Sequence, residues 1–192
     1  MVYLFVLLIF ALLYLISVYN SLQTLKVRIR AGIQEIGNQL KRQADLIPNL
    51  VSSTKGYLAH EKEIFDKLTT ARKAIIGALE SRDAQKMIES QELLGKALAG
   101  LRVVVESNPQ IKASEVVSRL MAELRDTADK VMYSRRTLID LVADFNQKLV
   151  VFPSSLVAKI FGFQKEEGLR VSREEEFLAV RAEETKTPEV KI

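Results

Sequence analysis

The first 25 residues contain no charged side chain, and the run from Val2 to Val18 consists almost entirely of Leu, Val, Ile, Phe, Ala and Tyr. About 20 apolar residues cross a hydrocarbon core of roughly 30 Å at a rise of 1.5 Å per residue. The pattern therefore predicts a transmembrane anchor over residues 1–25. A cleaved signal peptide fits less well, because no Lys or Arg precedes the apolar run and the stretch after it matches a cleavage site poorly.

The next apolar pattern runs from Leu40 to Leu79 in steps of three, four and seven residues, which is typical of one face of a long helix. Pro48 falls inside this pattern and removes one backbone hydrogen bond. We therefore expect either a kink at Pro48 or a new helix with Asp45 as its cap. The alternating pattern of a half-buried strand is absent from the sequence.

Two further helices are predicted by their end signals. Asp83 is a favourable N-cap for the second helix, and Asn108-Pro109 should end it, because a residue before proline is disfavoured in the α region. Ser114 can cap a third helix that lasts until Pro153. Their apolar stripes are Met87, Leu94, Leu98, Leu101 and Val105 in the second, and Val117, Leu120, Met121, Leu124, Val131, Leu138, Leu141, Val142, Phe145 and Leu149 in the third.

Two long helices joined by a shorter one favour an elongated antiparallel bundle over residues 26–163. The predicted fold class is thus all-α, with one N-terminal transmembrane helix followed by this bundle of long helices. The apolar segment 154–163, SSLVAKIFGF, either closes the end of the bundle or contacts the membrane interface or a partner. Residues 164–192 are rich in charge and are expected to form a flexible tail.

Charge supports a membrane location more than a nucleic-acid surface. The formal net charge is only +4, and Lys26, Arg28 and Arg30 follow the apolar run directly. Basic residues beside a first span usually stay in the cytoplasm, so the body is predicted to be cytoplasmic. The same three cations can attract anionic lipid headgroups.

Candidate catalytic chemistry is sparse. The chain has no Cys and a single His, His60, so neither a thiol nucleophile nor a His-Glu-x-x-His zinc site can be formed. The glycines are isolated and make no phosphate-binding loop. We expect a protein that is not an enzyme and needs no cofactor or metal.

Several blocks of the sequence resemble the LemA family over about residues 13–163. The first is QADLIPNLVSSTKGYLAHEKEIFDKLTTARKA, from Gln43 to Ala74. The others are Tyr19-Asn20-Ser21-Leu22, Asn108-Pro109-Gln110-Ile111-Lys112-Ala113, Phe145-Asn146, and Phe152-Pro153 to Phe161-Gly162-Phe163. The resemblance marks two sets of positions for packing or interaction. They are Asp45, Pro48, Asn49, Tyr57, His60, Glu61 and Arg72 in the first block, and Phe152, Pro153, Phe161, Gly162 and Phe163 in the terminal apolar segment.

The resemblance implies a single span in a bacterial inner membrane and a long-helix bundle, without a settled enzymatic activity. Two functional hypotheses follow. The preferred one is a scaffold that forms homo-oligomers and organises the lipid bilayer or membrane partners. The alternative is an adaptor that presents its bundle to a membrane protein partner such as a protease in envelope quality control.

Overall fold

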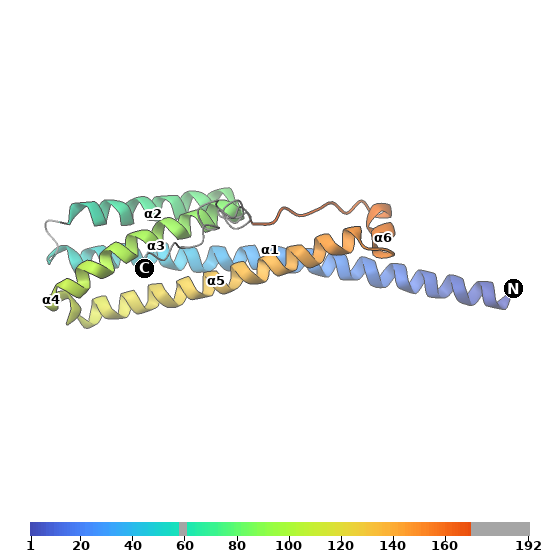
Figure 1. The fold of residues 1–192 in the computed structure, drawn as a ribbon, viewed down its shortest axis with the longest axis horizontal. Coiled ribbons are helices and arrows are strands. Elements are labelled where there is room, and N and C mark those ends of the chain that lie inside the picture. The colour runs from blue at the N-terminus through green and yellow to red at the C-terminus, as the bar shows by residue number, and fades with distance from the viewer. Residues whose placement is uncertain (58–60, 170–192) are drawn as a thin grey trace, which may run out of the picture.

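The computed structural model describes residues 1–57 and 61–169, and the regular structure in these residues is entirely helical. This confirms the all-α prediction. The helices are α1 (Val2–Lys55), α2 (Lys62–Ser81), α3 (Ala84–Ser107), α4 (Pro109–Lys112), α5 (Glu115–Val150) and α6 (Ser154–Ile160). They form a long rod from which the N-terminal part of α1 projects (Figure 1).

The anchor and the first helix of the bundle are one continuous helix. α1 is 54 residues long, which corresponds to about 80 Å at 1.5 Å per residue. Residues 2–17 of α1 are exposed except for the half-buried Leu15, whereas packing against the core begins at Val18 and Leu22 is fully buried. The bundle therefore begins inside the stretch that the sequence assigned to the anchor, rather than at residue 26.

The prediction of one helix from Leu40 to Leu79 was wrong. α1 ends at Lys55, and α2 runs back alongside it in the opposite direction (Figure 1). The apolar stripe continued across the break because both helices turn their apolar residues toward the same core, with Leu50 and Leu68 both fully buried. Asp45 caps no helix, since α1 continues through it and through Pro48.

The predicted ends of the later helices are confirmed. The Asp83 carboxylate accepts hydrogen bonds from the backbone N–H groups at the start of α3, and the Ser114 hydroxyl accepts one at the start of α5. Asn108 ends α3 as expected, but its side chain also caps the short helix α4, which the sequence pattern did not predict. The caps at Asn108 and Ser114 fix where the chain turns at the end of the rod far from the N-terminus, and the cap at Asp83 fixes the turn between α2 and α3, about midway along the rod (Figure 1).

The core is a column of aliphatic side chains between the α1–α5 pair and the α2–α3 hairpin. Its fully buried large members are Phe145, Leu22, Ile36, Leu40, Ile47, Leu50, Leu68, Ile75, Leu94, Leu101, Ile111 and Leu124. Gln43 is also fully buried, and within the described chain neither atom of its amide has a hydrogen-bond partner. The two long helices α1 and α5 provide the most extensive contact, so they form the spine of the rod.

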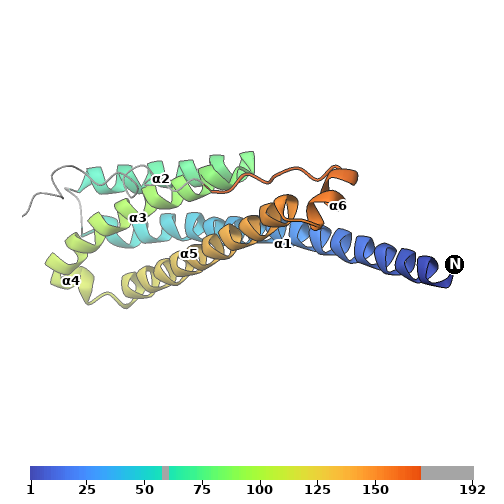
Figure 2. The ribbon, with the colours of Figure 1, turned by 45° about the vertical axis from the view of Figure 1, so that its right-hand side comes forward.

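Residues 164–169, which the prediction placed in a flexible tail, lie along the bundle. This segment leaves α6 and returns in extended form beside the rod (Figure 2). The Asn146 side-chain amide donates to the Glu166 carbonyl at 2.9 Å and accepts from the Glu166 N–H at 3.0 Å. Leu169 packs against the core. The rest of the predicted tail, residues 170–192, lies outside the described residues.

Candidate functional site

An aromatic cluster joins α1 to the end of α6. It lies where the N-terminal part of α1 leaves the rod. The Tyr19 ring lies 4.8 Å from the Phe161 ring and 5.8 Å from the Phe163 ring, measured between centroids. Phe163 also packs edge-on against the buried Phe145 of α5 at 6.3 Å. The cluster therefore fixes the end of α6 to the helix that the sequence identifies as the anchor.

Gly162 makes this arrangement possible. Its φ of +67° lies in the left-handed region, which glycine adopts without the steric cost of a Cβ. The Phe163 N–H then donates to the Ala158 carbonyl and the Gly162 N–H to the Lys159 carbonyl, which is the Schellman pattern for ending a helix. The chain reverses sharply enough for Phe161 and Phe163 to reach the same tyrosine.

The segment before this turn has two different faces. Val157 and Ala158 are buried against the bundle, whereas Phe152 and Ile160 are 76% and 72% exposed and Leu156 is also exposed. The Phe152-Pro153 bond is cis, and the Ser154 hydroxyl donates to carbonyls at the end of α5. The segment thus caps the bundle with one face, as one of the two sequence alternatives expected, and leaves an apolar face uncovered.

The three cations after the apolar run have different surroundings. The Lys26 ammonium lies 3.6 Å from the Glu166 carboxylate, so it holds the returning segment, while Arg28 and Arg30 are exposed. Arg30 also lines a hollow of about 600 Å³ together with Lys41 and Arg82, and no acidic residue lines it. This hollow therefore presents a basic surface.

Pro48 and Arg72, both in the family-like block, act on the same backbone group. Pro48 has no N–H to donate to the carbonyl four residues earlier, which belongs to Ala44. The Arg72 guanidinium from α2 donates its Nε–H to this carbonyl at 2.9 Å. A side chain of the second helix thus replaces the missing hydrogen bond of the first and ties the two helices together.

The other residues of that block lie at the end of α1 and the turn to α2. Asp45 and Asn49 are exposed on α1, Tyr57 is half exposed just after it, and Glu61 directly precedes α2. His60 lies outside the described residues. The structure therefore brings Pro48 and Arg72 together, and leaves Asp45 and Asn49 as surface groups.

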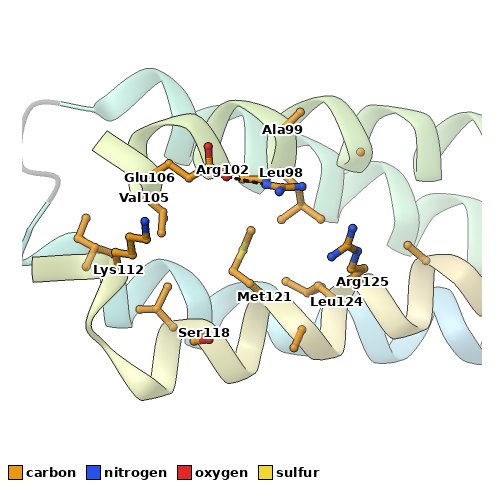
Figure 3. Close-up of a pocket in the computed structure, with 15 residues that line it drawn as sticks. Leu98, Ala99, Arg102, Val105, Glu106, Lys112, Ser118, Met121, Leu124 and Arg125 are labelled. Carbon is orange, nitrogen blue, oxygen red and sulfur yellow. Dashed lines mark hydrogen bonds and ion pairs between the residues drawn. The ribbon is translucent and has the colours of Figure 1, made fainter. Parts of the chain in front are cut away.

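A groove separates α3 and α5 at the far end of the rod. It has a volume of about 530 Å³ and an apolar lining that includes Leu98, Val105 and Met121. Figure 3 shows Met121 and Arg125 directed from α5 toward α3, and Arg102 paired with Glu106 at 2.9 Å. The sequence assigned the three apolar residues to core stripes, and periodicity cannot distinguish a core from a groove between diverging helices.

Titratable groups give little sign of catalytic chemistry. The Lys67 ammonium, 2.6 Å from the Glu63 carboxylate, lowers the pKa of Glu63 through a hydrogen bond and charge attraction, at a fully exposed position on α2. In residues 1–57 and 61–169, no group of three or more His, Cys, Asp or Glu side chains is placed to hold a metal ion.

These features define a class of protein: a rod-shaped helical bundle whose first helix includes a stretch that is long and apolar enough to cross a membrane. The model of the LemA family matches residues 32–191, and the chain belongs to that family. The match confirms the resemblance. It does not include the apolar run, and it continues beyond residue 163. A comparison with curated proteins finds no match to the chain.

Proposed function

We propose that the chain is a non-enzymatic scaffold, held in a bacterial inner membrane by one span, with its body in the cytoplasm. The observation that carries this proposal is the apolar run of α1, which no other part of the chain covers in residues 1–57 and 61–169 and which continues into the rod without a break. A protein of this shape has a fixed relation between its membrane segment and its bundle. It can therefore set the arrangement of whatever binds along the bundle.

The basic residues after the run support the cytoplasmic orientation. Arg28 and Arg30 are exposed, and the charged residue that comes first in the chain is Lys26. Lys and Arg within about 15 to 20 residues of a span favour the cytoplasmic side. Each cation near the surface adds about 1 kcal/mol of attraction to anionic lipid.

Self-association is the second part of the proposal. The apolar run contains no glycine, so it lacks the close-packing GxxxG pattern of tightly associating spans. The outer surface of α5 instead exposes Met132, Tyr133 and Ile139 within about two turns. Copies inserted in one direction can pack side by side along such a face, and repeated contacts of this kind close into rings when the rotation permits.

The absence of Cys from the sequence makes this contact directly testable. We introduce Met132→Cys on the outer surface of α5, and Lys96→Cys on the exposed side of α3 as a matched control. A short bismaleimide should link copies carrying Met132→Cys into dimers in native membranes, and link the Lys96→Cys control far less. If only monomers are found and a different protein is cross-linked in a constant ratio, the scaffold hypothesis fails and the adaptor hypothesis takes its place.

The groove between α3 and α5 favours the adaptor as the second candidate function. Its lining is apolar, and it carries Arg102, Lys112 and Arg125 against one acid, Glu106. Such a groove suits an acidic amphipathic helix of a membrane protein partner, whose apolar face would cover Leu98 and Met121. A protease subunit with such a segment is one partner of this kind.

A further inference from the structure

The length of α1 that is free of the bundle is shorter than a bilayer. Residues 2–17 rise by about 24 Å, whereas the hydrocarbon core is about 30 Å thick. The bundle is already in contact with α1 at Val18 and Tyr19. If α1 spans the membrane along its normal, the level of Tyr19 lies at the edge of the hydrocarbon core, and the parts of the bundle at that level lie there too.

The part of the bundle at that level is α6. Phe161 at its end stacks on Tyr19, and both views of the fold place α6 at the end of the rod from which the apolar run projects (Figures 1 and 2). The exposed apolar side chains of Leu156 and Ile160 lie four residues apart in α6, so they share one side of the helix. Phe152, in the turn that precedes α6, and Phe161, directly after it, are exposed apolar side chains at the two ends of the helix.

We propose that this apolar face of α6, defined by Phe152, Leu156, Ile160 and Phe161, is seated in the bilayer interface beside α1. The proposal rests on the proposed function, because it requires α1 to span the membrane. The occupant is lipid rather than a second chain, since the face is continuous with the uncovered apolar run of α1. Lys159, exposed on the same short helix, can reach the headgroups while the apolar side chains enter the acyl boundary.

A second point of contact changes what the anchor does. One helix crossing a bilayer is free to rotate about its axis and to tilt. When α6 also enters the interface, the end of the rod is held at the membrane surface at a second point, which limits its tilt. The basic residues Arg28 and Arg30 then lie at a defined height above the hydrocarbon core in every copy.

The chain has no Trp, so single Trp probes report their own positions in the full-length protein. We place Trp at Ile160→Trp on α6, at Leu8→Trp in the apolar run, and at Val103→Trp, an exposed position on α3, as the matched control. Each variant is reconstituted in vesicles that contain phospholipids brominated near the headgroup end and phospholipids brominated near the methyl end of the acyl chain, so that both the edge and the middle of the hydrocarbon core carry the quencher. Fluorescence quenching by bromine is measured for each probe, and quenching by aqueous iodide is measured in parallel.

The expected result is strong bromine quenching of the probes at positions 8 and 160, with at least threefold weaker quenching at 103. Quenching at 8 without quenching at 160 overturns the interfacial contact and leaves the anchor in place. If neither bromine nor iodide quenches the probe at position 160, a second copy covers that position, and this result also overturns the interfacial contact. No quenching at 8 refutes the anchor itself. Phe152→Trp serves as a second probe of the same face if Ile160→Trp perturbs α6.

Discussion

At the residue scale, the most specific contact in the bundle is made by Arg72 to the carbonyl that Pro48 leaves without a donor. A proline inside a helix costs about 3 kcal/mol or more, partly through the lost hydrogen bond. The Arg72 Nε–H reaches the Ala44 carbonyl at 2.9 Å and replaces that bond from another helix. The two residues should therefore depend on each other energetically, although they are 24 positions apart in the sequence.

A double-mutant cycle tests this dependence. Arg72→Met should lower the free energy of unfolding by about 1–2 kcal/mol, because it leaves a partly buried carbonyl unpaired. In a Pro48→Ala background the new N–H supplies the missing donor, so the same change should cost about half as much or less. Denaturant unfolding of the detergent-solubilised protein, followed by circular dichroism, measures both values.

Lys73→Met, at the exposed neighbouring position, is the control and should change the stability by about 0.5 kcal/mol or less in either background. Equal costs of Arg72→Met with and without Pro48 would show that the guanidinium acts only through packing. The sequence could identify both residues by family resemblance, but not their contact, because periodicity places side chains on faces and does not pair them across helices.

At the element scale, the turns capped by Asp83 and Ser114 were predictable and the turn after Lys55 was not. Asp83 and Ser114 could be recognised because an N-cap is a local signal, with the side chain and its backbone partners two or three residues apart. The turn after Lys55 has no such side-chain cap, and Gly56, a lone glycine, was no stronger a signal than Gly77 or Gly95, which both lie inside helices. The stripe of α1 continued into α2, so the pattern gave no break there.

The returning segment 164–169 was missed for a related reason. It is held by hydrogen bonds between a side chain and the backbone, and by the Lys26–Glu166 ion pair, rather than by an apolar stripe. A charged, irregular stretch of sequence carries no periodic sign of such contacts. Asn146 was visible through family resemblance, but its partner lies 20 residues further along the chain.

Removing this clamp should release the segment. Asn146→Ala deletes both hydrogen bonds to Glu166, and each is worth about 0.5–1.5 kcal/mol. We expect the Glu166 amide to exchange with solvent deuterium at least about fivefold faster, with little change in exchange inside α5. Hydrogen exchange followed by mass spectrometry measures this, with Asp144→Ala, at an exposed position two residues earlier in α5, as the control. Unchanged exchange at Glu166 would show that Lys26 and Leu169 hold the segment without the amide.

At the scale of the whole molecule, the continuity of α1 is the feature with the largest consequence. A helix that runs without a break from the apolar run into the core transmits the orientation of that run to the bundle. Packing begins at Val18, and Leu22 and Ile36 are fully buried between α1 and its neighbours. The run and the bundle are thus joined rigidly but share few contacts, since residues 2–17 make no contribution to the buried core.

Deletion of residues 2–17 should therefore leave the fold intact while removing attachment to the membrane. The melting temperature of the truncated protein should agree with that of the full-length protein within about 2 °C, measured by circular dichroism in the same mild detergent. Because the run lacks glycine and gives no reason for tight helix pairing, association is assigned to the bundle, and sedimentation of the truncated protein should still detect self-association at high concentration. Adding Met132→Lys, on the exposed surface of α5, should abolish that association. A folded, strictly monomeric truncated protein would assign assembly to the span and contradict the bundle contact.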